Sequence, residues 1–317
     1  MFTQHSSGRS QRSRRASGEK NTDDPTTNKS STQCTVMCMY QTKIAGLCRI
    51  VTVLWCKNLI SVSVNISVEN PGDENPYNCK IDLKPWVFWS KKGFKSFTVG
   101  GKRVDVYWDF RSAKFSLSPE PIGDYYVALV SDEEVVLLLG ECKNEAYKRT
   151  KSKPSSIEAV LMCKKENVLG KKCFCTRAKF DEKEKDYDIV VENSISGPRE
   201  PEMWISIDGI VLIHVKNLQW KFRGNQTVLV KKTPVQVFWD VHDWLFSSNG
   251  LGHGIFLFKP GAQEYVSDLE KEGSSRSCDG DGDGDGDGES NRSGKFSTQS
   301  RSTSPDFCLY LYAWKLG

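Results

Sequence analysis

Apolar and polar residues alternate with a period of two along many short stretches of the chain. This alternation is typical of β-strands that bury one face. The clearest runs are Arg49–Trp55, Ser61–Val68, Val104–Trp108, Asp188–Glu192, Trp204–Asp208 and Ile210–Val215. Asp208-Gly209 lies directly between two of these runs, and Gly100-Gly101 is placed similarly. Both pairs predict two-residue hairpins, because a type I′ turn needs a positive φ at both central residues.

A buried hairpin, a helix and a last strand can also be predicted from the distribution of apolar and polar residues. Residues 124–130 and 134–140 are strongly apolar and joined by a short acidic turn, which predicts a buried hairpin. Only the stretch around Cys142–Lys151 favours a helix. Residues 307–314 alternate again, so we expect a last strand that returns to the sheet.

One passage of the chain occurs twice. Residues 89–109 and 220–240 align without a gap at an offset of 131 residues. The identical pairs of most interest are Trp89 with Trp220, Gly93 with Gly224, Trp108 with Trp239, and Asp109 with Asp240. We interpret the shared residues as structural, with Trp108 and Trp239 packed under the strand ends and Asp109 and Asp240 as acceptors of turn amides.

The repeat leads to a prediction for the whole fold. We expect an all-β protein, a two-sheet antiparallel β-sandwich built from an internally duplicated unit, because two similar sheets can cover each other's apolar faces. The two units span about residues 47–140 and 173–258, with the basic segment 143–172 between them. Together with the last strand they would form one domain, residues 34–262 plus 306–317.

Two segments have a composition that does not favour a packed core. Residues 1–33 are rich in Ser, Thr, Arg and Asn and predict a disordered tail. Residues 263–305 predict a low-complexity linker, a disordered loop before the last strand. Its Asp-Gly run, 279–288, resembles the start of a calcium loop, but the twelfth position is Ser290 rather than the bidentate glutamate that such loops need.

Charge, cysteine usage and hydropathy bear on the partners and the compartment. The 44 basic and 40 acidic residues give a net charge of only +4, so charge gives no argument for nucleic acid. The 11 cysteines are odd in number and include no C-x-x-C pair, which favours reduced thiols. The sequence shows no long apolar run and no apolar signal core. We therefore expect a protein of the cytosol or nucleus, without a signal peptide or membrane span.

The candidate chemistry is sparse. His242 lies between Asp240 and Asp243, and a carboxylate beside an imidazole is a familiar catalytic pair. The first copy of the repeat has Phe110-Arg-Ser at the matching positions, and the chain has no G-x-S-x-G nucleophile motif. The three residues are therefore weak catalytic candidates, and we expect neither a metal site nor a cofactor. Lysines and aromatic residues interleave in both copies, so a groove for nucleic acid is a further alternative.

Longer motifs resemble a known family. They are CKIDLKPWVFWSKKGFKSF (79–97), VDVYWDFRSAKF (104–115), DYYVALVSDEEVVLLLG (124–140), PEMWISIDGIVLIHVKNLQWKFRGNQTV (201–228), VQVFWDVHDWLF (235–246) and FCLYLYAWK (307–315). In this order they look like the plant family called domain of unknown function 868. The resemblance implies a plant source and a shared β fold, and it implies no activity, cofactor or catalytic residue.

The sequence thus predicts a non-enzymatic binding or scaffold module whose partner is most simply another protein. An enzyme centred on Asp240, His242 and Asp243 is the alternative, and a nucleic-acid-binding protein that uses basic and aromatic strands is the third. Because the shared residues look structural, we expect function where the copies differ, first at Phe110–Ala113 against Val241–Trp244.

Overall fold

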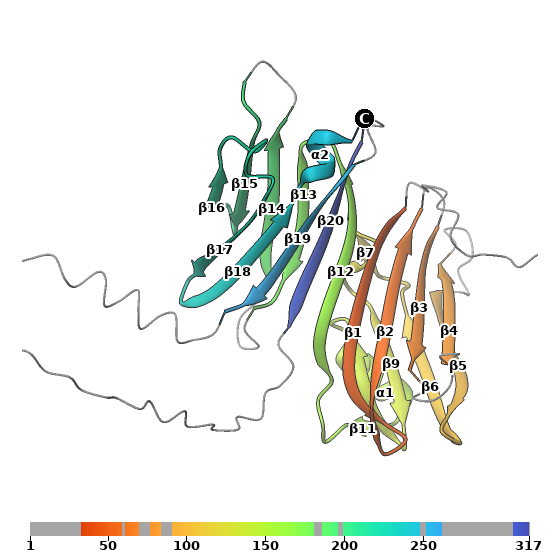
Figure 1. Ribbon diagram of the computed structural model, residues 1–317. Coiled ribbons are helices and arrows are strands. Elements are labelled where there is room, and N and C mark those ends of the chain that lie inside the picture. Colours follow the sequence, from red (N-terminus) through yellow and green to blue (C-terminus); the bar gives the residue numbers. More distant parts are fainter. Residues whose placement is uncertain are drawn as a thin grey trace, which may run out of the picture. The chain divides into compact units, whose positions relative to one another are not determined.

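The protein consists mainly of β-strands, which confirms the predicted fold class at this coarse level (Figure 1). The computed structural model describes residues 33–58, 61–69, 77–83, 91–180, 186–195, 199–247, 252–261 and 307–316. The predicted tail and linker, 1–33 and 263–305, lie almost wholly outside these ranges, so their disorder stays a prediction.

The main element is a nine-stranded sheet. From one edge to the other its strands are β17 (Arg223–Val230), β18 (Thr233–Asp240), β19 (His253–Pro260), β20 (Cys308–Lys315), β12 (Val160–Gly170), β1 (Cys34–Ile44), β2 (Leu47–Lys57), β3 (Val62–Val68) and β4 (Tyr77–Leu83). All neighbours are antiparallel except β12 and β20, which run parallel. The predicted last strand is confirmed as β20, which lies inside the sheet rather than at an edge.

Three smaller sheets and two helices complete the described structure. The five-stranded sheet has the order β11 (Lys153–Pro154), β10 (Glu134–Leu139), β9 (Tyr126–Ser131), β6 (Lys102–Asp109) and β5 (Lys92–Val99). The four-stranded sheet has the order β13 (Cys173–Ala178), β14 (Tyr187–Ser194), β15 (Glu202–Ile207) and β16 (Ile210–Val215). The remaining elements are the two-stranded sheet of β7 (Lys114–Phe115) and β8 (Pro121–Gly123), and the helices α1 (Lys143–Thr150) and α2 (His242–Phe246).

The predicted hairpin turns have the backbone geometry that we expected. Gly100 and Gly101 have φ values of 57° and 79°, and Asp208 and Gly209 have 49° and 79°. Positive φ at both central residues matches the right-handed twist of the flanking strands, which is why these turns join adjacent antiparallel strands. The turns therefore fix the register of β5 with β6 and of β15 with β16.

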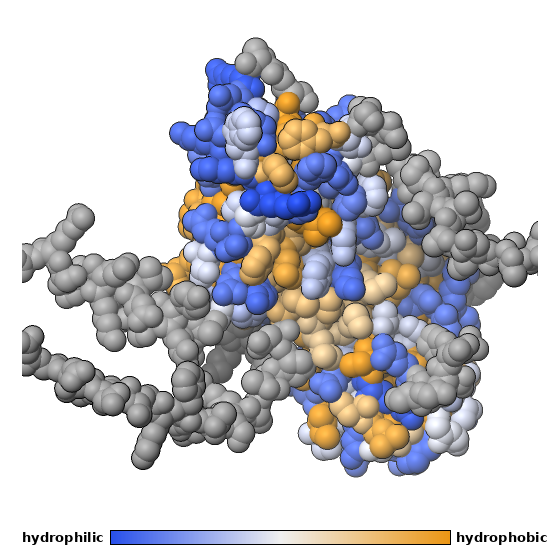
Figure 2. All heavy atoms as spheres, in the orientation of Figure 1, coloured by the Kyte–Doolittle hydropathy of each residue, from blue (hydrophilic) through white to orange (hydrophobic). Residues whose placement is uncertain are grey.

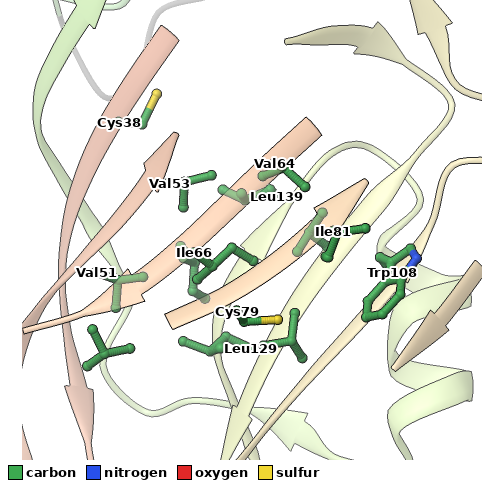
Figure 3. Packing of buried hydrophobic residues seen from close by; sticks show 14 of the residues in the cluster. Cys38, Val51, Val53, Val64, Ile66, Cys79, Ile81, Trp108, Leu129 and Leu139 are labelled. Carbon is green, nitrogen blue, oxygen red and sulfur yellow. The ribbon is translucent and has the colours of Figure 1, made fainter. Parts of the chain in front are cut away.

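A first hydrophobic core lies between the half of the nine-stranded sheet made of β1–β4 and the five-stranded sheet. Figure 3 shows part of it, with side chains of β2, β3 and β4 beside Leu129 and Leu139. At one end the indole of Trp55 meets the rings of Phe110 and Tyr125 edge-on, with ring centroids 5.9 Å apart in each pair. Packing of this kind fixes the position of the chain just after β6.

A second hydrophobic core lies between the other half of the nine-stranded sheet, β17–β20, and the four-stranded sheet. Phe256 and Phe258 from β19 and Leu309 and Leu311 from β20 are fully buried there. Trp244 of α2 also enters this core, where its indole N–H donates to the carbonyl of Ala313 over 2.8 Å. The short helix, which the sequence did not predict, thus closes one end of the core.

Strand β12 joins the two halves of the nine-stranded sheet. We expected the basic segment 143–172 to separate the repeat units, but its second part instead pairs with β1 on one side and β20 on the other (Figure 1). Glu166 is in register with Val36 of the first core and with Leu311 of the second. Residues opposite each other in neighbouring strands share a face of the sheet. Both cores, and both smaller sheets that cover them, therefore lie on the same face of the nine-stranded sheet.

Helix α1 covers the outer face of the five-stranded sheet. Ala146 of α1 packs with Tyr126, Ala128 and Val130 of β9 in a small third cluster. Because β9 contacts apolar residues on both faces, all of its residues are buried, as we predicted for this hairpin. Neither helix of the described residues is long and apolar enough to cross a membrane.

Candidate functional site

The Gly and Trp residues of the repeat form cross-strand pairs. Gly93 lies opposite Trp108 in β5 and β6, and Gly224 lies opposite Trp239 in β17 and β18. A Cβ atom on Gly93 would come within 2.7 Å of the Trp108 ring, and one on Gly224 would come still closer to the Trp239 ring. Each indole therefore lies over the backbone of its glycine, a space that a side chain would fill. Trp89 lies outside the described residues, and Trp220 is 82% exposed.

The aspartates of the repeat accept turn amides in both copies, as the sequence predicted. Asp109 Oδ1 accepts the backbone N–H of Arg111 over 3.2 Å, and Asp240 Oδ1 accepts that of His242 over 3.1 Å. Asp109 also pairs with the side chains of Lys92 and Arg111. Asp240 pairs with Arg223, whose Nε lies 2.8 Å from Oδ2.

The same contacts set the acidity of these aspartates. Burial raises the pKa of each carboxyl, but hydrogen bonds and positive charge outweigh it. The pKa of Asp109 is lowered by Arg111 and Lys92, and that of Asp240 by the His242 amide and Arg223. Both carboxylates are therefore ionised and engaged at neutral pH.

The structure brings the weak catalytic candidates close together without placing them in either of the two cavities described below. His242 Nδ1 lies 3.2 Å from Asp243 Oδ1, and the imidazole packs against the rings of Phe222 and Phe246, which also contact each other. His253, on β19, lies 3.8 Å from the other oxygen of Asp243. Asp240, as described above, is engaged by the backbone and by Arg223.

Several basic side chains of the repeated passage are neutralised by carboxylates. These ion pairs are Lys92–Asp109 at 3.3 Å, Lys102–Asp132 at 3.1 Å, Arg103–Asp105 at 2.7 Å and Arg223–Asp240 at 2.8 Å. Cations that are already paired release fewer counterions when a phosphate binds, so they contribute less to nucleic-acid affinity. Figure 2 likewise shows hydrophilic and hydrophobic residues interspersed over the face in view.

A cleft with polar groups on its floor lies over β12, where the five-stranded and four-stranded sheets leave the nine-stranded sheet uncovered. Its volume is about 710 Å³. Lys164 and Glu166 of β12 and Cys38 and Tyr40 of β1 form its floor. One wall is the chain from Ser116 to Ile122, and the other is the edge strand β13 with the start of β14. A cleft of this size accommodates a small organic molecule.

Lys164 is the centre of the polar groups in this cleft. Its ammonium lies 2.6 Å from Glu166 Oε1 and 3.7 Å from Glu120 Oε2, and it donates to the carbonyl of Arg177 over 3.1 Å. Glu166 points to the core face of the sheet and is buried. Lys164 therefore compensates a buried carboxylate that would otherwise strongly destabilise the fold.

Burial and neighbouring charges raise the pKa values of Glu120, Lys164 and Cys38 above their usual values. Burial raises the pKa of the Glu120 carboxyl, and Lys164 offsets only part of this shift. Burial alone would lower the pKa of Lys164, but Glu166 and Glu120 outweigh it and raise the pKa above its usual value. Burial also raises the pKa of the Cys38 thiol. At neutral pH Lys164 is thus a cation and Cys38 a thiol, and neither is an activated nucleophile.

Thr176 adds an unused polar group to the wall of the cleft. It belongs to β13 and is buried. Its hydroxyl has no hydrogen-bond partner among the described residues. A buried hydroxyl without a partner destabilises the folded protein, by about 1–3 kcal/mol. A ligand that hydrogen-bonds to this hydroxyl would remove that penalty.

Comparison with known proteins places the chain in a family. The model of a family described as plant protein of unknown function (DUF868) matches residues 31–315. The chain belongs to this family. Searches of curated proteins and of solved structures gave no significant match.

The DUF868 match includes every strand described above and thus the whole cleft. A second cavity in this DUF868 chain, about 730 Å³, lies beside Lys102, Arg103 and Thr150. Four of its charged residues already pair with one another, Lys102 with Asp132 and Arg103 with Asp105. No group of three or more His, Cys, Asp or Glu in the described part of the chain is placed to hold a metal ion. The cleft over β12 is therefore the better candidate for a binding site.

The sequence analysis did not identify the residues of this DUF868 cleft. Lys164 and Glu166 lie in a basic segment that we interpreted as a separator, and Glu120 lies in the irregular chain between β7 and β8. One signal was present: a glutamate two residues after a lysine shares its face on any strand. That spacing indicates a shared face only once residues 160–170 are known to form a strand.

Proposed function

We propose that the protein is a non-enzymatic binding module whose site is the cleft over β12. The observation that carries the proposal is the set of polar groups at the bottom of the cleft, where Lys164, Glu120 and Glu166 interact and the Thr176 hydroxyl is left over. Buried polar groups are costly, and sites that bind small molecules combine apolar walls with a few such groups. Tyr40, Tyr125 and Phe307 supply apolar surface here.

We infer further that the scaffold is a pair of β-sandwich halves derived from one duplicated unit. In each half, a four-stranded meander is followed by a second group of strands that covers it. The Gly–Trp pairs and the aspartate turns recur at equivalent places in the second group. On this interpretation, β12 has no counterpart in either unit, and the cleft exists because the units are joined through it.

The binding proposal can be tested by blocking the cleft from an exposed position. In Cys175→Trp an indole would project from β13 into the cleft, which Cys175 lines. Cys173→Trp is the matched control, because Cys173 is an exposed cysteine on the same face of the same strand and is not among the lining residues. The full chain is incubated with the small-molecule fraction of a plant extract, and bound compounds are identified by mass spectrometry after gel filtration.

We expect one or more compounds to be retained by the wild type and by Cys173→Trp and to be lost from Cys175→Trp. Retention by all three proteins would place binding elsewhere and overturn the proposal. No retained compound at extract concentrations well above those in the tissue would overturn it as well.

An enzyme that uses Asp240, His242 and Asp243 remains the alternative proposal. It is supported by the two imidazoles, His242 and His253, that lie beside the carboxylate of Asp243. The binding module is favoured because Asp240 is fully engaged in a turn and a salt bridge, and because the His242 ring packs against Phe222 and Phe246. Turnover of a substrate that is lost in His242→Gln would reverse this preference. A protein partner and a cytosolic or nuclear location stay predictions.

A further inference from the structure

We propose that the cleft over β12 binds a small organic cation, a molecule that carries an ammonium group on a short apolar chain. The inference deepens the proposed function, since it names the ligand class of the same site. It rests on three independent properties of the cleft, namely its charge, the hydrogen bonds that remain unused in it, and its aromatic walls.

The charge of the cleft is negative. Its lining includes five carboxylates, Glu120, Glu141, Glu166, Asp186 and Asp188, and three basic residues, Lys164, Arg177 and Lys179. The balance is two negative charges when all are ionised. An anionic ligand would have to enter against this field, whereas a cation would be attracted, and the low-dielectric walls strengthen either effect.

Two of the three positive groups, Lys164 and Arg177, are already engaged by acceptors of the protein. Lys164 is held by Glu166 Oε1 over 2.6 Å and donates to the carbonyl of Arg177 over 3.1 Å. Arg177 pairs with Asp188 over 2.7 Å. A ligand carboxylate or phosphate would therefore have to displace a protein partner, and the protein carbonyl or carboxylate so displaced would be left without its hydrogen bond.

Two acceptors of the cleft, Glu120 and the Thr176 hydroxyl, can in contrast still accept hydrogen bonds. Glu120 Oε2 is 3.7 Å from the Lys164 ammonium, beyond normal hydrogen-bond length, so a closer donor can bind to this carboxylate. The Thr176 hydroxyl has no hydrogen-bond partner among the described residues and can accept as well as donate. A ligand ammonium has three donors and no acceptor, which fits this pair of groups.

The walls suit the apolar part of such a ligand. Tyr40, Tyr125 and Phe307 line the cleft together with Leu161 and Ala178. Aromatic faces attract cations by about 0.5–2 kcal/mol when the site is partly desolvated. A methylene chain between two ammonium groups would bury against the aliphatic side chains. An inorganic cation has no apolar chain to bury against these walls.

Three four-carbon probes with the same chain length test the inference, because they differ only in charge. They are putrescine, with two ammonium groups, 1,4-butanediol, with two hydroxyls, and succinate, with two carboxylates. Binding of each to the full chain is measured by titration calorimetry and by the shift in melting temperature at low salt. We expect putrescine to bind and to raise the melting temperature, with affinity that falls as salt screens the cleft, and the other two to have no effect.

Two variants locate the binding. Glu120→Gln removes the carboxylate, and Glu134→Gln is its matched control, since Glu134 has nearly the same side-chain exposure, 27% against 28%, and also pairs with a lysine. We expect at least about a tenfold loss of putrescine affinity in Glu120→Gln, which corresponds to about 1.4 kcal/mol, and none in Glu134→Gln. Thr176→Val should weaken binding without lowering the melting temperature, because it removes a hydroxyl that has no hydrogen-bond partner among the described residues.

Proton release gives a separate readout. Glu120 is surrounded by Lys164 and Glu166 of β12, Asp186 before β14, Cys38 and Tyr40 of β1, and Tyr125 before β9. Burial raises its pKa, and a bound ammonium would lower that pKa again by favouring the ionised form. Binding should therefore release protons, seen as a binding enthalpy that depends on the buffer, and should strengthen as the pH rises through the pKa of Glu120.

The outcomes distinguish a failure of the proposed ligand class from a failure of the proposed binding function. Equal binding of the diol, or stronger binding of succinate, would overturn the cation inference and leave the binding module standing. Putrescine binding that survives in Glu120→Gln would also overturn it, because surface carboxylates would then suffice. If no probe binds but the extract experiment retains a compound that Cys175→Trp loses, the function stands and the ligand class is wrong. If neither experiment identifies a ligand, the proposed binding function and the proposed ligand class are both refuted.

Discussion

The two copies of the repeated passage end in the same way and then diverge. After β6, Asp109 accepts the amide of Arg111, and the Arg111 guanidinium folds back on the same carboxylate, with Nη2 2.8 Å from Oδ2. After β18, Asp240 accepts the amide of His242, but the His242 imidazole turns away to Asp243. The turn after β6 is thus held by Arg111 and Asp109, whereas the turn after β18 leads into helix α2.

This difference serves packing at both turns. In the first half, Phe110 fills the core against Trp55 and Tyr125. In the second, Trp244 of α2 fills the core against Phe174 and Phe256. We expected function at Phe110–Ala113 and Val241–Trp244, where the copies differ, but the structure gives these positions aromatic anchors. The candidate site instead lies over β12, which belongs to neither copy.

The largest expected effect comes from the two tryptophans. Trp108 is only 6% exposed, whereas Trp239 is partly exposed. Trp108→Ala should lower the free energy of unfolding by about 3–5 kcal/mol, and Trp239→Ala by about half as much, because it removes less buried surface. Urea unfolding followed by far-ultraviolet circular dichroism measures both. Equal losses would mean that the two copies pack alike, contrary to the burial seen here.

The glycines opposite these tryptophans should have the next largest effect. Gly93→Ala and Gly224→Ala should each lower the free energy of unfolding by about 1–3 kcal/mol, because a Cβ atom would clash with the indole ring. The cost should vanish when the indole is removed first, so Gly224→Ala in a Trp239→Leu background should be neutral or stabilising. A cost that persists in that background would show that the backbone, rather than the ring, requires glycine.

The aspartates differ in exposure, which predicts a smaller and pH-dependent contrast. The Asp109 side chain is 16% exposed and that of Asp240 is 37% exposed. At pH 7, Asp109→Asn should cost about 1–2 kcal/mol, and Asp240→Asn less than about 1 kcal/mol because solvent screens its ion pair.

The pH dependence follows from the sign of the pKa shifts. Both aspartates have a pKa that is lowered on folding from the ordinary value of 3.8. A lowered pKa stabilises the folded protein above the unfolded value and ceases to do so as the pH falls through the folded value. The cost of Asp109→Asn should thus be complete at pH 7 and shrink below about pH 4. Urea unfolding at pH 7 and pH 3 tests this, and an unchanged cost at pH 3 would refute it.

The smallest expected effect is at the residues that follow these aspartates. His242→Gln should change the free energy of unfolding by less than about 0.5 kcal/mol, because the side chain is well exposed and its contact with Asp243 is at the surface. Arg111→Gln removes a guanidinium with three hydrogen bonds to Asp109 and should cost slightly more. A larger cost at His242 than at Arg111 would mean that the turn after β18 is the more tightly held.

Much of the fold could be predicted because the local rules agree with the final structure. Val104–Trp108 and Val62–Val68 alternate between apolar and polar residues, and each forms a strand with one face buried. The Gly100-Gly101 and Asp208-Gly209 turns need only local backbone geometry, which the residue types provide. The helix at Lys143–Thr150 was predicted within two residues at each end.

The candidate site could not be predicted, because its position depends on contacts between distant parts of the chain. Strand β12 does not alternate, and almost all of its residues are partly buried, since it lies within the nine-stranded sheet between the two cores rather than over one of them. A buried Glu166 looks like a surface residue in the sequence. Helix α2 has only five residues, too few to show a helical period.

The position of β20 has a consequence for how the protein is made. This strand is inserted between β19 and β12, although a long segment separates it from β19 along the chain. Until it arrives, β19 and β12 each present a row of unpaired amides and carbonyls. Rows of this kind pair readily with other chains. A translation product that stops before Cys308 would therefore have two unpaired strand edges, on β19 and β12, in place of one continuous sheet. We expect this product to aggregate.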